Sequence, residues 1–205
     1  LRTFEQERLE LLASAATVPV VNALSDFEHP CQALADLLTI REVKGDLAGR
    51  TLVYLGDGNN VTHSLLLAGA KAGMHVRAAT PPGFEPKADV TEWATRESRK
   101  TGATCLVTND PAEAVRDADA VYTDVWASMG QEAEAEARKK VFRPYQVNEA
   151  LMKHAKADAI FMHCLPAHRG DEVTDGVIDA PYSVVFPQAE NRLHVQKAVM
   201  LRLLA

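Results

Sequence analysis

The sequence predicts an α/β protein, a three-layer sandwich in which a mostly parallel sheet lies between two layers of helices. From Thr51 onward, apolar runs of strand length alternate with segments of helical spacing. Strands that are separated by helices pair in parallel, and the helices cover both faces of the sheet. In addition, the polar motifs stand directly after the predicted strands, where ligands bind in sheets of this kind.

Three elements precede the alternating region. Residues 4–16 have the spacing of an amphipathic helix. Residues 18–24 form a short apolar run, which we interpret as a buried strand that Pro19 interrupts. Pro30 suits the first turn of a helix that runs to about Lys44, because proline is tolerated at that position.

The alternating region continues to the end of the chain. Its predicted strands are residues 51–55, 75–79, 104–107, 120–123, 159–163 and 183–186. Its predicted helices are residues 61–72, 90–100, 111–116, 133–140, 147–155, 173–178 and 189–204. Together these elements predict a doubly wound, Rossmann-like sheet. The last helix is apolar on several sides, so we expect it to be buried on more than one side, to dock on residues 4–16, or to self-associate.

Composition excludes several classes of function. The 205 residues are 47% hydrophobic and 24% charged, an ordinary globular balance. A net charge of −6 without any basic run argues against nucleic acid as a partner. No apolar run is long enough to span a membrane. Three widely spaced cysteines, Cys31, Cys105 and Cys164, predict neither a disulfide framework nor a metal site, and favour a reducing, cytoplasmic compartment.

The first motif, Gly-Asp-Gly-Asn-Asn at residues 56–60, follows a predicted strand and opens a helix. This placement is typical of a dinucleotide fingerprint, but Val61 stands where the third glycine is needed. The next strand ends in Ala-Ala-Thr at residues 78–80 and offers no acid for a ribose. We therefore expect Asn59 and Asn60 to offer amide groups at the sheet edge, with simple turn chemistry as the alternative.

The second motif, Asp-Val-Trp-Ala-Ser-Met-Gly at residues 124–130, also follows a predicted strand. Asp124 can pair with an ammonium group, and Ser128 with the backbone near Gly130 can bind a carboxylate. These groups would suit the two charged ends of an amino acid. The alternative is an ordinary loop in which the serine caps a helix.

The third motif is His-Cys-Leu-Pro at residues 163–166, after another predicted strand. Cys164 is a candidate functional thiol, whose reactivity would depend on a lowered pKa. Its alternative is a small buried hydrophobic side chain. His168 and Arg169 follow closely and add cationic groups near the same edge.

Two further sites lie on the helices that flank the sheet. His29 stands just before the helix that begins at Pro30, and Gln32 follows one turn later, so both can reach one small polar ligand. Arg192 lies near the start of the last helix and can bind a phosphate or a carbonyl oxygen. The alternatives are a capping or solvated histidine and an exposed salt bridge.

In this order, and at one edge of one sheet, the motifs resemble the aspartate/ornithine carbamoyltransferase family over nearly the whole chain. The His-Pro-x-Gln element at residues 29–32 is common to the whole family. The pair formed by residues 124–130 and 163–166 is more specific and is similar to the members that use ornithine.

The resemblance implies an activity and a set of site residues. The carbamoyl group of carbamoyl phosphate would pass to the side-chain amine of L-ornithine, giving L-citrulline and phosphate in arginine metabolism, without a metal or organic cofactor. The residues implied for ornithine are Asn60, Asp124, Ser128 and Met129. Those implied for carbamoyl phosphate are His29, Gln32, Cys164, Leu165 and Arg192. Cys164 would be a catalytic group that handles a proton, with a carbamoyl-thioester route as the alternative.

The resemblance also implies a division of the chain. Residues 1–28 would be the remnant of a second α/β domain that binds carbamoyl phosphate. Residues 29–187 would be the ornithine-binding domain with its leading interdomain helix, and residues 188–205 a helix that returns toward the first domain. The family's Ser-x-Arg-Thr phosphate cradle is absent from the sequence. We therefore expect a shortened enzyme, inactive alone, from a family that forms homotrimers through the first domain.

Two rival functions remain open at this stage. The chain can be an amino-acid-binding fragment without turnover, or a sibling carbamoyltransferase that uses another amine. A nucleotide-dependent oxidoreductase is weakened by the missing glycine and the missing ribose acid. The choice between an anabolic and a catabolic role stays open as well.

Overall fold

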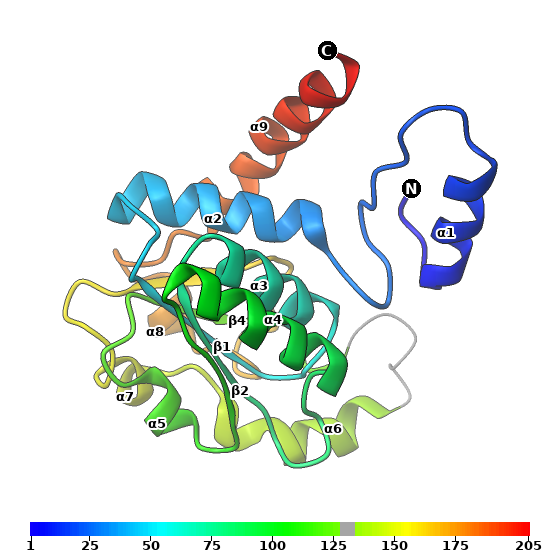
Figure 1. Ribbon diagram of the computed structural model, residues 1–205. Coiled ribbons are helices and arrows are strands. Elements are labelled where there is room, and N and C mark those ends of the chain that lie inside the picture. The colour runs from blue at the N-terminus through cyan, green and yellow to red at the C-terminus, as the bar shows by residue number, and fades with distance from the viewer. Residues whose placement is uncertain (128–133) are drawn as a thin grey trace.

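The computed structural model describes residues 1–127 and 134–205. In these residues, five parallel strands form one sheet in the order β3-β2-β1-β4-β5 (Figure 1). The strands are β1 Thr51–Leu55, β2 His75–Ala79, β3 Cys105–Thr108, β4 Ala120–Thr123 and β5 Ile160–His163. The helices are α1 Gln6–Ala15, α2 Pro30–Lys44, α3 Asn60–Lys71, α4 Ala88–Thr101, α5 Pro111–Val115, α6 Ala135–Phe142, α7 Glu149–Met152, α8 Asp175–Ile178 and α9 Val185–Leu204.

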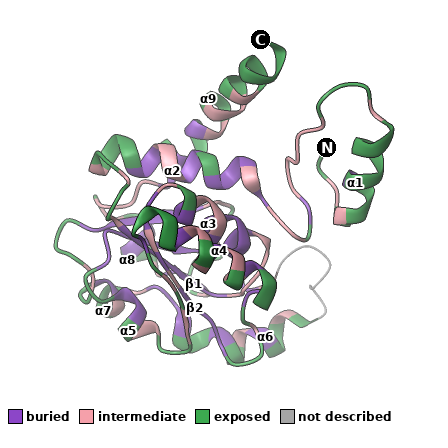
Figure 2. Cartoon of the chain, viewed as in Figure 1, coloured by how far each residue is buried: buried purple, intermediate pink, exposed green. Residues whose placement is uncertain are grey.

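Helices cover both faces of the sheet, because the central strands are apolar on both sides. Leu52 and Tyr54 of β1 point into a core formed with α2, α3 and α4. Val53 and Leu55 of the same strand point into a second core, formed with α5, α7 and α8. Both pairs of side chains are fully buried, as the purple strands of Figure 2 show. The predicted α/β sandwich with a doubly wound parallel sheet is confirmed.

Most predicted strands agree with the structure. β1, β2 and β4 have the predicted bounds, whereas β3 is displaced by one residue and β5 begins one residue late. The predicted helix at residues 147–155 is too long, since only α7 is formed. Val147 instead exchanges backbone hydrogen bonds with the segment near Val173, and Asn148 caps α7 through its side chain.

Two predicted strands are wrong. Residues 18–24 form no strand, since only Leu24 makes an isolated bridge, to Arg2. Residues 183–186 also form none: Ser183 makes one parallel bridge to Phe161, and α9 then begins at Val185 rather than at Ala189. Proline is tolerated in the first turn of a helix, so Pro187 allows this earlier start. Both segments are apolar runs, but neither has a partner strand along its length.

The two ends of the chain carry exposed apolar side chains. The first half of α9 packs on α2, but the second half extends away from the body and exposes Leu201 and Leu204 (Figures 1 and 2). α1, which exposes Leu11, lies apart from α9 in the same view. The expected burial of α9 on more than one side and its docking on residues 4–16 are therefore absent from this chain. No helix in the described parts of the chain is long and apolar enough to cross a membrane.

A buried carboxylate stabilises, through hydrogen bonds, the end of the sheet that is opposite the predicted site. Asp119, which precedes β4, is fully buried and accepts hydrogen bonds from the backbone N–H of Thr51 and from the side chains of Arg50 and Lys156. Burial acts to raise the pKa of this carboxyl, but the three donors outweigh it and lower the pKa. The charged form is therefore stabilised in the folded protein.

We expect Asp119→Ala to lower the free energy of unfolding by about 3 kcal/mol, since it removes a buried charged acceptor and leaves the buried N–H of Thr51 without its partner. Urea unfolding measures this change. The control Asp179→Ala removes an exposed ion pair with Arg169 and should cost much less. Because the folded pKa of Asp119 is lowered, its contribution is present at neutral pH and is lost as the pH falls below the unfolded value of 3.8. Equal costs for the two variants would contradict this account.

Candidate substrate-binding site at the switch point of the sheet

The predicted motifs meet at the carboxyl edge of the sheet, where β1 lies beside β4 and β4 beside β5. The chain turns in opposite directions from β1 and β4, and this divergence opens a crevice at the edge. A cavity of about 510 Å³ lies there. It is lined by Arg2, Phe4, Leu24, Ser25, Asp26, His29, Asp57, Asn59, Asn60, Val61, Asp124, Val125, Ala127, Cys164, Leu165, Pro166, His168 and Arg192.

Asp124 is the centre of the cavity wall. It is 7% exposed and accepts hydrogen bonds from the Cys164 thiol at 3.0 Å, the Asn59 side-chain amide at 3.3 Å and the Val125 N–H at 2.8 Å. One carboxylate thus joins the loops that follow β1, β4 and β5. Its remaining acceptor capacity can bind an ammonium group of a ligand.

The thiol of Cys164 is held in its protonated form. Burial, followed by the carboxylate of Asp124, raises the pKa of Cys164 well above its usual value. Activated cysteine nucleophiles have the opposite shift, because the thiolate is the reactive form. The lowered pKa on which a reactive thiol depends is therefore not found, and the neutral thiol acts here as a hydrogen-bond donor to Asp124.

Asn59 is a residue that the predicted site set lacked. Its side-chain oxygen accepts hydrogen bonds from the N–H groups of Val61 and Thr62 and so caps α3. Its side-chain nitrogen is thereby directed to Asp124. The predicted Asn60 also lines the cavity, and it donates to the carbonyl of Ser25 at 2.6 Å. The sequence shows two asparagines at the start of α3, but it does not show which of them faces Asp124.

The cationic end of the cavity is formed by His29 and Arg192. Burial, then the guanidinium of Arg192, lowers the pKa of His29 to about 4, so its imidazole is neutral near pH 7. His29 Nδ1 and Arg192 Nε are buried and have no hydrogen-bond partner among the described residues. Buried polar atoms of this kind need a partner, which a polar ligand or water would supply.

Gln32 reaches this end of the cavity only indirectly. It is 1% exposed and does not line the cavity, but its side-chain oxygen accepts a hydrogen bond from Arg192 at 2.5 Å. Leu165 does line the cavity, and its φ of 58° is rare for a residue with a side chain. The N–H of Leu165 donates to His163 Nδ1 at 2.8 Å. Backbone strain of this type clusters at ligand sites.

Arg138 connects two of the loops, and nothing in the sequence pattern indicates this role. Its guanidinium donates to the carboxylate of Asp57 and to the carbonyl of Trp126. It lies 4.9 and 5.0 Å from the ring centroids of Phe84 and Phe142, which contact each other edge to face. Arg138 and Asp57 are 81 positions apart, so no local pattern could have paired them.

Ser128 and Met129 lie outside the described residues, so their roles stay predictions. Arg169, expected near the same edge, instead forms exposed ion pairs with Asp175 and Asp179.

The residues best able to hold a metal ion are Asp124, His163 and Cys164, whose ligand atoms lie within 4.8 Å of one another. Each of them already has a hydrogen-bond partner. The thiol is bonded to Asp124, and His163 accepts from Leu165 and lies 3.3 Å from Glu172. We therefore interpret the group as a hydrogen-bonded cluster.

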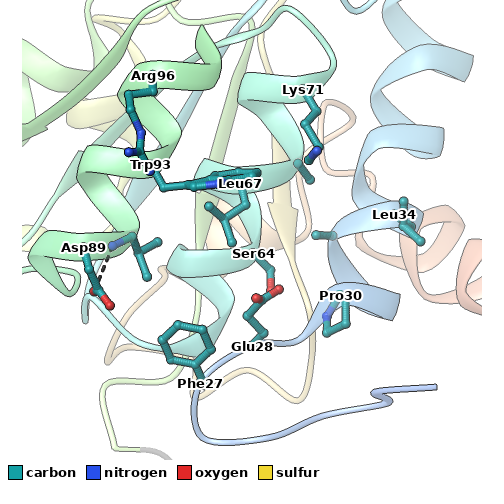
Figure 3. A pocket seen from close by; sticks show the side chains of 13 residues that line it. Phe27, Glu28, Pro30, Leu34, Ser64, Leu67, Lys71, Asp89, Trp93 and Arg96 are labelled. Carbon is teal, nitrogen blue, oxygen red and sulfur yellow. Dashed lines mark hydrogen bonds between the residues drawn. The ribbon is translucent and has the colours of Figure 1, made fainter. Parts of the chain in front are cut away.

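A second cavity, of about 640 Å³, lies away from this edge, between α2, α3 and α4 (Figure 3). It is mostly apolar, and the Lys71 ammonium lies 5.0 Å from the centroid of the Trp93 ring in its wall. None of the predicted site residues that the structure describes lines it. The cavity at the sheet edge is therefore the better candidate for chemistry.

Two family models match the chain. Residues 48–203 match the family model "Aspartate/ornithine carbamoyltransferase, Asp/Orn binding domain". Residues 1–42 match "Aspartate/ornithine carbamoyltransferase, carbamoyl-P binding domain". The predicted division into residues 1–28, 29–187 and 188–205 stays a prediction.

Among curated relatives, the ornithine carbamoyltransferase of Anoxybacillus flavithermus is 62% identical over 100% of this chain and 65% of its own length. The anabolic ornithine carbamoyltransferase of Pyrococcus furiosus is 61% identical over 97% of this chain and 63% of its own length. The chain thus spans about 65% of the length of the curated relatives it matches.

Solved structures give the same result. The ornithine carbamoyltransferase of Pyrococcus furiosus superposes with a TM-score of 0.94 at 61% identity, covering 97% of this chain and 64% of that one. The enzyme from Gloeobacter violaceus gives 0.94 at 52% identity, covering 100% of this chain and 68% of that one. The family model covers most of the chain and the relatives are more than half identical to it, so the chain belongs to the aspartate/ornithine carbamoyltransferase family.

Proposed function

We propose that the chain carries the ornithine site, and part of the carbamoyl-phosphate site, of an ornithine carbamoyltransferase. The observation that carries the proposal is the cavity at the sheet edge. It has a carboxylate, Asp124, bonded to a protonated thiol at one end, and a neutral imidazole beside a guanidinium at the other. These are the groups needed for an amino acid and for an anionic carbonyl compound.

The ornithine end would be built from the loops that follow β1 and β4. Asp124 would accept hydrogen bonds from the α-ammonium group, and Asn60 would support it from the start of α3. Ser128 and Met129 would hold the α-carboxylate. Arg138 would act indirectly, since it fastens Asp57 and the carbonyl of Trp126 on either side of this end.

The carbamoyl end would be built from α2 and α9. Attack of the ornithine amine on the carbonyl carbon places negative charge on the carbonyl oxygen, and phosphate then leaves. Arg192 and an N–H of neutral His29 would stabilise that charge, with Gln32 holding the guanidinium. Leu165 would cover the junction between the two substrates. Alignment of the two substrates would supply a large part of the rate.

Cys164 would position the reacting amine rather than form a covalent intermediate. The side-chain amine of ornithine must lose a proton before it attacks, because an ammonium group has no lone pair. A thiol that is protonated and bonded to Asp124 is a poor nucleophile and cannot take that proton, so the proton would pass to solvent, while the sulfur accepts a weak hydrogen bond from the neutral amine. The chemistry proposed here requires no metal or organic cofactor.

The remaining parts of the proposal rest on relatives. We propose a cytoplasmic enzyme of arginine biosynthesis, since one relative in the family is named anabolic. We also propose a homo-oligomer, a trimer as the family resemblance implies. Amino-acid binding without turnover is the second candidate for these 205 residues taken alone, because they contain no Ser-x-Arg-Thr cradle.

We expect Asp124→Asn to weaken ornithine binding by about 1.5–3 kcal/mol, the contribution of a hydrogen bond to a charged group. Calorimetric titration of the chain with ornithine measures the dissociation constant. The control Asp110→Asn changes another acid that follows a strand, but one that caps α5 outside the cavity, and should leave the constant unchanged. Equal ornithine dissociation constants for wild type and Asp124→Asn would show that Asp124 does not bind ornithine.

We expect Cys164 to react with iodoacetamide only at unusually high pH. The midpoint of its rate against pH should lie above the ordinary thiol value of about 8.5. Asp124→Asn should lower that midpoint, because removing a nearby negative charge favours the thiolate. Mass spectrometry of the alkylated peptide follows the reaction. A midpoint below the ordinary value would indicate an activated nucleophile and support the covalent route.

We expect the 205 residues alone to form citrulline no faster than background. The phosphate cradle of the family is absent from this sequence, so carbamoyl phosphate lacks its main anion site. A citrulline assay measures this directly, with the Anoxybacillus flavithermus relative as the positive control. Turnover by the chain comparable to that of the relative would refute this expectation and exclude the binding-only function.

A further inference from the structure

A carboxyl group outside the cavity is buried in the middle of the helices that flank it. Asp36 of α2 is fully buried, and it forms no ion pair with any residue that the structure describes. Its Oδ1 accepts two hydrogen bonds, from the side-chain amides of Gln32 at 2.8 Å and Gln188 at 2.7 Å. A buried carboxyl without a cation costs free energy, so its presence calls for a reason.

The two amides reach both ends of the cavity. Gln32 turns its nitrogen to Asp36 and therefore its oxygen to Arg192, at 2.5 Å. Gln188 turns its nitrogen to the same carboxyl, and its oxygen accepts from the backbone N–H of His163 at 2.9 Å. An amide has donors at one end and an acceptor at the other, so an acceptor at Asp36 determines which end each glutamine directs outward.

Packing of the two helices does not by itself explain this arrangement. Asn191 already joins α9 to α2, through hydrogen bonds to Thr39 at 3.0 Å and Glu42 at 2.7 Å. An apolar pair at the position of Asp36 and Gln188 would pack the helices without burying a carboxyl. What an apolar pair could not do is orient the two outward-facing amide oxygens.

A buried tyrosine adds a second observation. The hydroxyl of Tyr122 on β4 and the Oδ2 atom of Asp36 are both buried, and neither has a hydrogen-bond partner within the described residues. Burial, then the nearby charges of Asp36 and Cys164, raise the pKa of Tyr122 well above its usual value. Two buried polar atoms, one on β4 and one on α2, therefore have unused hydrogen-bonding capacity in the described structure.

We propose that Asp36 is a positioning residue that aligns both ends of the cavity, the Arg192 guanidinium through Gln32 and the strand end that carries Cys164 through Gln188. The inference rests on the proposed function, since it assigns a purpose to the alignment. Asp36 touches no substrate; it acts through the two glutamines.

The test uses the intact chain and measures alkylation of each cysteine by iodoacetamide at one fixed pH. Asp36→Leu has a similar size but no acceptor, so Cys164 should react about tenfold faster, the effect of losing one hydrogen bond. Asp36→Asn keeps an oxygen acceptor and should stay within about threefold of wild type. Cys105 on β3, at the far edge of the sheet, is the internal reference and should not change.

Gln188→Met is the second variant, and it tests the positioning role of Asp36 if Asp36→Leu does not fold. It removes the amide between Asp36 and His163 while leaving Asp36 in place, and it should accelerate Cys164 as Asp36→Leu does. Equal acceleration of Cys164 and Cys105 would mean that Asp36 only supports the fold. Equal rates in Asp36→Asn and Asp36→Leu would mean that its charge acts, not its hydrogen bonds. Either result overturns the proposal.

Ornithine binding separates this inference from the function on which it rests. The Asp124→Asn titration tests the proposed function, whereas the alkylation rates of the Asp36 and Gln188 variants test this inference. If the wild-type chain binds no ornithine, the proposed function fails, and the alkylation rates still decide whether Asp36 positions the strand end.

Discussion

The parallel order of the strands is the constraint on which the rest of the structure depends. β1 lies between β2 and β4, so the connections from β1 and β4 leave in opposite directions and open a crevice at the carboxyl edge. Asp124 stabilises this edge of the sheet, because its carboxylate accepts hydrogen bonds from the loops that follow β1 and β5. A slip of one residue in the β1–β4 register would separate these groups, as each side chain would then face the other side of the sheet.

The interior strands could be predicted from the sequence because they are buried on both faces. β1 and β4 are short, almost wholly apolar runs with clear ends, and such runs have few alternatives in a sheet covered by helices. β2 is less regular, since His75 and Arg77 are only half-buried, but its remaining residues are apolar and buried. Residues 18–24 and 183–186 have a similar apolar character but lack a neighbouring strand along their length. Strand formation is decided by pairing across the sheet, and a local pattern does not report the partner.

The same limit applies to the site. Asp124, Cys164, His29 and Arg192 could be placed near one another because strand ends and helix starts of a doubly wound sheet meet at one edge. The hydrogen bonds that hold those residues in place could not be predicted, since they join positions that are far apart in the sequence. Gln188 and Asp36 are 152 positions apart, and Asp36 reads in the sequence as one more polar residue of a helix. Burial alone shows that it belongs to the interior.

The central claim is that an amino acid binds at the carboxyl edge between β1 and β4. The most direct measurement is a titration of the ¹⁵N-labelled chain with ornithine, followed by nuclear magnetic resonance of the backbone amides. The account predicts that the largest shift changes occur at Asn59, Asn60, Val125 and Cys164. Shift changes confined to the second cavity, between α2, α3 and α4, or no shift changes at all, would contradict it.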